Sequence, residues 1–483
     1  YATHPNVEGM CKLLKDDSVR HLYCSGLCAS AASLFSSVLV QRAECPFVFI
    51  LGDLEEAGYF YHDLTQILGT GQVLFFPSSF RRAIKYGQKD AANEILRTEV
   101  LSRLQKGEEG LCVVTYPDAL AEKVVSRKEL GDKTLKLHVG EKVDMDFVTE
   151  VLRSYGFEYV DYVYEPGQYA VRGSIIDVFS FSSEFPFRID FFGDEVESIR
   201  TFEVESQLSR EKKEEIVIVP DLSRSLEQGG NGGMVSFLGF LRPDTLLAMR
   251  DFLWLRERIQ AVHDESLTAQ AIAACEAEEN GAISLEGKLI DGGEFTLRAL
   301  DFRRMEFGTK PTGTPDATVA FSTVAQPIFH KNFDLVAESF RDYLSLNYPL
   351  YICSDSLKQT DRIRAIFEDR GDNISFTPVE RTLHEGFADD TLRLCIFTDH
   401  QLFDRFHKYN LKSDKARSGK VALSLKELNQ FTPGDYVVHT DHGVGRFTGL
   451  IRIPNGDTTQ EVMRLVYQND DVVFVSIHSL HKV

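Results

Sequence analysis

The most restrictive feature of the sequence is a regular alternation of short apolar runs and helix-length segments over its first 125 residues. Four runs carry the pattern: His21 to Cys24, Phe47 to Leu51, Val73 to Phe76 and Leu111 to Thr115. Short apolar runs are typical of buried strands, and parallel strands need helix-length connections between them. The pattern therefore predicts a parallel sheet built from βαβ units.

The later parts of the chain have other patterns, and 483 residues are too many for one hydrophobic core. Closely spaced aromatic and β-branched residues from about Leu135 to Arg210 indicate a smaller α+β module. A second αβ pattern follows, and a valine-rich segment interrupted by glycines indicates a small antiparallel barrel at the end. We predict a multidomain α/β protein divided as follows: 1–125 and 212–330 form one α/β domain, 126–211 is a module inserted into it, 331–412 is a second small α/β domain, 413–430 is a linker and 431–483 is the barrel.

Charge and composition limit the possible partners. The formal net charge of −20 repels phosphate backbones, so DNA binding would need a local basic patch. The eight cysteines are scattered, which is typical of reduced thiols; Cys24, Cys28 and Cys45 are better explained as structural residues than as metal ligands. The sequence has neither a signal peptide pattern nor an apolar stretch of about 18 residues, so we expect a cytoplasmic protein without membrane contact.

The run from Gly26 to Ser33 stands where a phosphate-binding loop would follow the first strand. Ala31 replaces the second glycine of the motif G-x-x-x-x-G-K-[ST], and Ala32 replaces the lysine that neutralises the phosphates. Ser33 keeps the hydroxyl position but cannot replace that charge. We interpret the run as a degenerate nucleotide site that is now a plain strand-to-helix turn. The alternative is a weak anion site at the start of the helix. We expect no cofactor or metal.

The segment from Phe187 to Glu195 predicts an exposed aromatic side chain. Strand alternation divides its residues between two faces: Phe187, Ile189 and Phe191 should point into the core, and Arg188, Asp190 and Phe192 should point away from it. Gly193 and Asp194 are predicted to form a two-residue hairpin turn, and the step at Arg172 to Ser174 is predicted to be a bulge that redirects Arg172.

An exposed phenylalanine near arginines is typical of a protein-interface hot spot. The alternative is that Phe192 is covered and that the arginines pair with Asp190 or Glu195. The catalytic motifs of other common enzyme classes are absent from the sequence, so no catalytic residue is assigned.

Two stretches, Tyr164 to Phe179 and Arg188 to Arg200, resemble domain 2 of the excision-repair protein UvrB and the matching module of the bacterial transcription-repair coupling factors (Mfd). In that family the module binds UvrA, and the implicated residues correspond to Arg172, Arg188 and Phe192. UvrB itself has a functional phosphate loop. The alanines at 31 and 32 are therefore the departure expected of a coupling factor, whose UvrB-like domain lacks ATP chemistry.

The segment from Pro433 to Leu450 resembles the opening of the RNA-polymerase-interacting domain shared by coupling factors and CarD-type regulators. The resemblance implies a Tudor-like barrel that pairs with the polymerase β subunit, through strand addition at an open edge. We expect Leu450, Arg452 and Ile453 to contact polymerase, with Ile453 as the anchor; its alternative role is in the barrel core. His439 and His442 are more readily explained as structural residues than as metal ligands.

Taken together, the resemblance implies the N-terminal adaptor part of a coupling factor, which recruits UvrA to stalled RNA polymerase and has no ATPase site of its own. ATP, magnesium and most DNA contacts would belong to motor domains further along such a protein, and a C-terminal domain would mask the UvrA-binding face. We expect a monomer. Two alternatives stay open: a UvrB-like ATP-dependent repair helicase, and a CarD-like regulator that binds only polymerase. Residues 331–412 carry no assigned chemistry.

Overall fold

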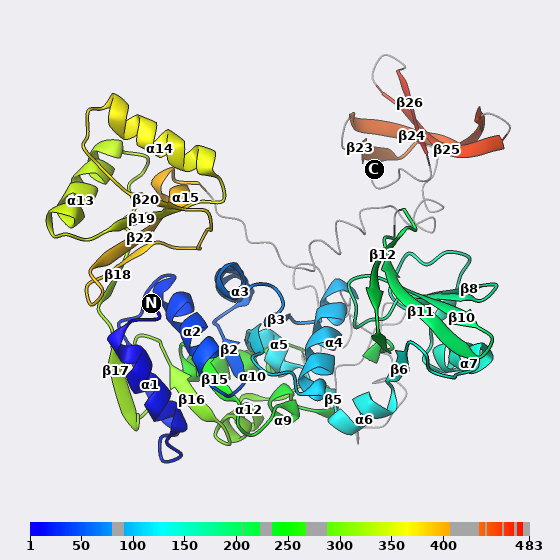
Figure 1. Cartoon of the computed structure of the whole chain (residues 1–483), viewed down its shortest axis with the longest axis horizontal. Helices are drawn as coiled ribbons and strands as arrows, with labels where there is room; N and C mark the ends of the chain where they lie inside the picture. Colours follow the sequence, from blue (N-terminus) through cyan, green and yellow to red (C-terminus); the bar gives the residue numbers. More distant parts are fainter. Residues whose placement is uncertain are drawn as a thin grey trace.

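The computed structural model of the protein (Figure 1) describes residues 1–79, 91–204, 206–222, 234–266, 287–405, 434–439, 442–455, 458–467 and 471–476. Within these ranges, the side chains of 91, 92, 450, 452–455, 458–461 and 476 are outside the description. None of the described helices combines the length and the apolar character needed to cross a bilayer.

The first domain is a seven-stranded sheet in which all neighbouring strands are parallel, as the alternating pattern predicts. Its spatial order is β17-β1-β16-β15-β2-β4-β3. The strands come from both sides of the inserted module: β1 (His21–Ser25), β2 (Phe47–Ile50), β3 (Val73–Phe76), β4 (Cys112–Thr115), β15 (Leu246–Met249), β16 (Arg303–Glu306) and β17 (Ala317–Ala320).

Helices cover this sheet (Figure 1) and leave its central strands buried along their whole length. They are α1 (Pro5–Lys15), α2 (Ala31–Arg42), α3 (Leu54–Leu68), α4 (Ala91–Lys106), α5 (Pro117–Ala121), α6 (Arg127–Asp132), α9 (Phe237–Phe240), α10 (Phe252–Ser266) and α12 (Gly292–Ala299). A two-stranded ribbon, β5 (Val124–Val125) with β14 (Met234–Val235), adds to the domain.

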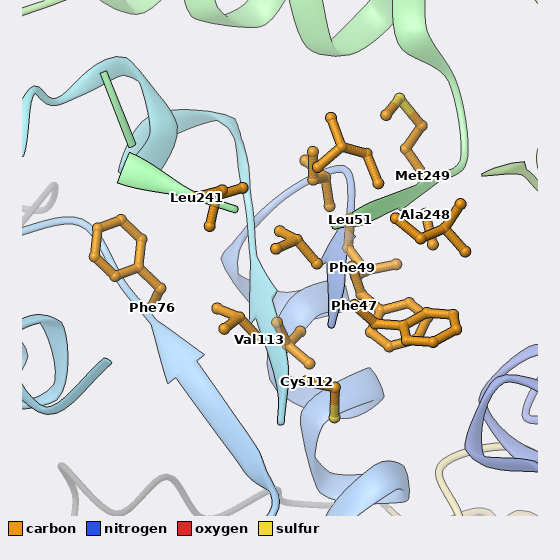
Figure 2. Close-up of a cluster of buried hydrophobic side chains, with 14 of the residues drawn as sticks. Phe47, Phe49, Leu51, Phe76, Cys112, Val113, Leu241, Ala248 and Met249 are labelled. Atoms are coloured by element: carbon orange, nitrogen blue, oxygen red, sulfur yellow. The ribbon is translucent and has the colours of Figure 1, made fainter. Parts of the chain in front are cut away.

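The core of this domain lies between the sheet and its helices. Figure 2 shows Phe47 and Phe49 of β2 close to Ala248 and Met249 of β15, and the two phenylalanine rings stack with their centroids 5.7 Å apart. Because these strands are buried on both faces, their sequences are continuously apolar rather than alternating.

The inserted module contains a six-stranded sheet in the order β12-β11-β10-β9-β8-β7. Its elements are α7 (Met145–Ser154), β7 (Glu158–Tyr159), β8 (Gln168–Arg172), β9 (Ile175–Val178), β10 (Phe187–Phe192), β11 (Glu195–Phe202) and β12 (Ser209–Lys213), and β6 (Leu135–His138) pairs separately with β13 (Glu215–Ile218). Ile216 and Ile218 pack in the core of this module, so the module extends past the expected boundary at 211.

The predicted bulge after Arg172 is wrong. Arg172 pairs directly with Ile175, and Gly173 and Ser174 form a tight turn between β8 and β9, with Gly173 at φ +63°. The positive φ of a glycine suits a two-residue hairpin, which reverses the chain and explains the change in strand phase. The hairpin turn predicted at Gly193 and Asp194 is confirmed, because Phe192 pairs with Glu195 across these two residues.

The second α/β domain contains a five-stranded sheet in the order β18-β21-β22-β19-β20. Its elements are β18 (Thr323–Ala325), α13 (Phe333–Ser345), β19 (Leu350–Cys353), α14 (Leu357–Asp369), β20 (Thr377–Val379), β21 (Phe387–Asp389), β22 (Leu394–Thr398) and α15 (Asp399–Leu402). Since β18 pairs with β21, this domain begins before the expected boundary at 331.

The described C-terminal strands form a four-stranded antiparallel sheet in the order β23-β24-β25-β26. They are β23 (Tyr436–His439), β24 (Gly443–Asn455), β25 (Thr458–Val466) and β26 (Val472–Ser476). A small core unites them, formed by Val437, Phe447, Met463, Leu465 and Val475. The linker expected at 413–430 lies outside the described residues.

Candidate protein interface

A single phenylalanine at the tip of the β10–β11 hairpin stands in solvent. Phe192 is 80% exposed, whereas Phe187, Ile189 and Phe191 on the same strand are buried. The alternation predicted from the sequence is therefore confirmed for this strand. Because burying a phenylalanine stabilises a fold, an exposed ring in an ordered strand contributes little to this domain and is available to a partner.

Two arginines converge on one buried carboxylate beside this hairpin. Strand β9 lies between β8 and β10, so Asp177 of β9 is within reach of Arg172 at the end of β8 and of Arg188 on β10. Arg188 makes a bidentate contact with Asp177: its Nε lies 2.8 Å from Oδ1 and its Nη2 lies 2.9 Å from Oδ2. Arg172 also donates a hydrogen bond to Oδ2 of Asp177. The hydrogen bond to Asp177 raises the pKa of Arg188.

The arginines do not form the pairs that the sequence suggested. Asp190 accepts hydrogen bonds from Ser198 and Arg200 instead. Arg188 shares a face with Phe192, but the expectation that both side chains point outward is wrong, because the Arg188 side chain is only 16% exposed. Its guanidinium is held by Asp177, by the carbonyl of Gln207 and by the ring of Phe202, 4.6 Å away.

Arg172 is the arginine that presents charge to solvent. Its side chain is 36% exposed, and its guanidinium lies 5.1 Å from the ring of Tyr162, a cation–π contact with a half-exposed tyrosine. The accessible part of this surface is therefore formed by Phe192, Arg172 and Tyr162, with Arg188 and Asp177 beneath. We call these five residues the arginine–aromatic surface.

Sequence reasoning missed Asp177, which is 1% exposed and organises both arginines. The available signal was a single acid inside the apolar strand Ile175 to Val178. A charge in a buried strand needs a partner, because an unpaired buried carboxylate is costly. The partners come from two other strands, and only the sheet order shows which they are.

Replacing Asp177 with asparagine should lower the free energy of unfolding of the module by about 3 kcal/mol, because the largely covered Arg188 then loses its countercharge. Urea unfolding followed by far-UV circular dichroism measures the loss. Asp190→Asn is the matched control: its partner Arg200 is more exposed, so we expect a loss of about 1 kcal/mol or less. Equal losses in the two variants would contradict the organising role of Asp177.

The degenerate nucleotide site holds its four expected residues at the junction of β1 and α2. Gly26 follows β1, and α2 begins at Ala31, so Ala31 and Ala32 are buried inside the first helical turn. The Ser33 hydroxyl donates to Asp63 Oδ2 at 2.7 Å. Burial raises the pKa of Asp63 to about 7, although hydrogen bonds from Ser30, Ser33 and His384 oppose the shift. The retained Ser33 hydroxyl is therefore already bonded to a carboxyl group of its own domain.

The residues expected to contact polymerase lie on β24, and their side chains are outside the described part of the chain. Their backbones pair with β25, in the registers Leu450 with Met463, Arg452 with Glu461 and Ile453 with Gln460. Strand β23 pairs only with residues 443–446 of β24. Among the described strands, the 449–455 segment of β24 therefore has one neighbour, β25, and an open second edge.

Comparisons with known proteins identify two domains of the chain. Residues 135–223 match the family model of the UvrB interaction domain, and residues 431–483 match that of the CarD-like/TRCF RID domain. The first match contains the whole arginine–aromatic surface, and the second contains β23 to β26. The chain is thus a multidomain protein that combines a UvrB interaction domain with a CarD-like domain.

Over nearly its whole length, the chain is a relative of the transcription-repair-coupling factors, which confirms the resemblance read from the sequence. It is 23% identical to the factor of Staphylococcus aureus (strain bovine RF122 / ET3-1), over 95% of this chain and 44% of that protein. It is 22% identical to the factor of Bacillus subtilis (strain 168), over 97% of this chain and 45% of that protein. The chain spans less than half the length of these relatives.

Proposed function

We propose that this chain is the adaptor part of a transcription-repair-coupling factor, which binds UvrA through its inserted module and the RNA polymerase β subunit through its C-terminal sheet. The observation that carries the proposal is the arginine–aromatic surface, located in the domain that matches the UvrB interaction domain. Neither partner site requires nucleotide chemistry in this part of the protein.

The UvrA contact is proposed to centre on Phe192. A large exposed ring beside a charged guanidinium has the composition of an interface hot spot, where a few residues supply most of the binding free energy. Arg172 would pair with an acidic group of UvrA, and Asp177 would keep Arg172 and Arg188 oriented before binding, which lowers the entropic cost of association. Further domains of a longer protein would cover this face until UvrA is needed.

The polymerase contact is proposed to use the open edge of β24. A strand from the β subunit can add to an unpaired edge through main-chain hydrogen bonds, and nearby side chains then provide selectivity. Leu450, Arg452 and Ile453 lie on the segment of β24 that has this open edge among the described strands. In this proposal Ile453 is the anchor, and Leu450 and Arg452 contact the polymerase beside it.

The enzyme alternative, a UvrB-like ATP-dependent helicase, needs a phosphate site. Ala32 replaces the required lysine, and Asp63 bonds to the retained Ser33. We therefore propose that this part of the protein binds neither ATP nor magnesium. Calorimetric titration with Mg-ATP should give no binding heat, and measurable heat would favour the helicase alternative.

The adaptor proposal is tested by titrating the purified chain with UvrA, with the polymerase β subunit and with both. We expect each partner to bind alone, and size-exclusion chromatography of the mixture should show one complex that contains all three proteins. A chain that binds the polymerase β subunit but fails to bind UvrA would favour the CarD-like alternative. Failure to bind either partner would reject the adaptor role.

A further inference from the structure

The second α/β domain contacts the degenerate nucleotide site directly. The Glu385 N–H donates to Ser30 Oγ at 3.0 Å, and the His384 N–H donates to Asp63 Oδ1 at 2.7 Å. The His384 ring also stacks on Tyr59 of α3, with centroids 3.4 Å apart and planes 12° apart. Residues 384 and 385 therefore lie at the start of α2, where the phosphates of a nucleotide would lie in a functional site.

A second segment of the same domain binds the loop itself. The Cys28 N–H donates to Thr323 Oγ1 at 3.0 Å, and the Thr323 hydroxyl donates to the carbonyl of Gly26 at 2.6 Å. In a functional phosphate loop, backbone N–H groups like that of Cys28 point at phosphate oxygens. Here a threonine at the start of β18 takes that place.

The buried polar groups at this contact are complementary. Asp63 is 2% exposed and accepts hydrogen bonds from Ser33 on its own domain and from His384 on the other. A further contact lies close to the N-terminus of the chain, where the Tyr1 hydroxyl donates to Asp389 Oδ2 at 2.5 Å. A buried acceptor that loses its donor is left without a hydrogen-bond partner, so separating the domains is unfavourable.

The remaining space at the contact disfavours a nucleotide. A cavity of about 310 Å³ remains there, and five acidic residues line it: Asp53, Glu55, Glu56, Asp63 and Glu385. Arg250 lines it as well, but its Nε is 2.8 Å from Glu56 Oε1. Desolvation lowers the pKa of His384 to about 4, so this ring is neutral near pH 7. The triphosphate of a nucleotide would meet an acidic site.

We propose that the degenerate phosphate loop has become the docking seat of the second α/β domain, with Thr323 and the His384–Glu385 segment as the built-in occupant. This assigns a role to a domain for which the sequence indicated none: the domain occupies the former nucleotide site and joins the first domain through it. The seat is distinct from the arginine–aromatic surface, so the two proposals can fail separately.

The proposed docking can be tested by hydrogen exchange, measured by mass spectrometry on the full chain. The measured quantity is the exchange rate of the His384 and Glu385 amides, which the docking contact protects. In Ser30→Ala and Asp63→Ala, each of which removes one acceptor, these amides should exchange roughly tenfold faster than in the wild type. Ser30 makes no side-chain capping bond to α2, so its replacement should leave the helix intact. Unchanged exchange in folded Ser30→Ala and Asp63→Ala would overturn the proposal.

Two control variants separate the seat from general effects. Ser37→Ala removes a hydroxyl from the same helix. Among the described residues this hydroxyl bonds to the Leu34 carbonyl, within the helix, so exchange at 384 and 385 should not change. Asp63→Asn keeps an acceptor oxygen and should restore most of the protection lost in Asp63→Ala. If the amides of His384 and Glu385 exchanged as fast in Ser37→Ala as in Ser30→Ala, the effect would be nonspecific and the seat would be rejected.

The same measurement examines the former ligand. Mg-ATP added to the wild-type chain should leave exchange from Gly26 to Ser33 unchanged, because the occupant is in place. Protection of those amides by Mg-ATP would overturn the proposal. Ser30→Ala should bind UvrA with wild-type affinity, because the seat is distinct from the arginine–aromatic surface. Failure of the wild-type chain to bind UvrA would reject the adaptor role without affecting the seat.

Discussion

Replacing Arg172 and Phe192 together with alanine should weaken UvrA binding by at least roughly a hundredfold, because an interface anchor contributes about 2 kcal/mol or more and a paired charge adds to it. The free energy of unfolding should change little. Phe192 is 80% exposed, and after the loss of Arg172 the buried carboxylate of Asp177 keeps its two-pronged contact with Arg188. Calorimetric titration with UvrA and urea unfolding measure the two effects.

The control for this double variant is Leu297→Ala. Leu297 is 71% exposed on α12, in the first domain, so it has comparable exposure outside the UvrB interaction domain. We expect UvrA affinity to be unchanged in this variant. If the folded double variant kept wild-type affinity, the arginine–aromatic surface would not be the UvrA site.

The local sequence pattern predicted those features of the fold that depend only on residues close together in the sequence. The apolar runs located four of the seven strands of the parallel sheet, β1 to β4, to within a residue or two, because strands buried on both faces are apolar throughout. Alternation placed Phe192 in solvent for a similar reason: the side-chain period of a strand is two. Neither inference needs information about distant parts of the chain.

Sequence pattern failed where a residue's partner lies on another strand or in another domain. Arg188 was expected in solvent, but the sheet order places Asp177 directly opposite it. The degenerate loop was recognised from Ala31 and Ala32, but the segment that occupies it could not be predicted. Glu385 is 355 residues from Ser30 in the sequence. It contributes a backbone N–H, which every residue except proline has. Such contacts leave no local pattern.

Gly26 illustrates how a motif residue can persist for a structural reason. As the first glycine of a phosphate-loop pattern, it suggests nucleotide binding. In the structure it has φ +78°, and a Cβ added there would lie 2.1 Å from the backbone oxygen of Phe321. Phe321 cannot easily retreat, because its N–H donates to the Ser25 carbonyl and its ring packs on Phe35, with centroids 4.6 Å apart. Close packing of the chain after β17 is enough to require glycine.

Gly26→Ala should therefore lower the free energy of unfolding of the first domain by about 4 kcal/mol, since it combines an unfavourable φ with a backbone clash. Gly107→Ala is the matched control: Gly107 has φ +71° with no atom within 4 Å of an added Cβ, so only the conformational cost of about 1–2 kcal/mol applies. Urea unfolding can be followed by the fluorescence of Trp254, the single tryptophan, on α10 of the same domain. A difference between the two variants below about 1 kcal/mol would show that Phe321 can move aside, and the packing explanation for this glycine would then be wrong.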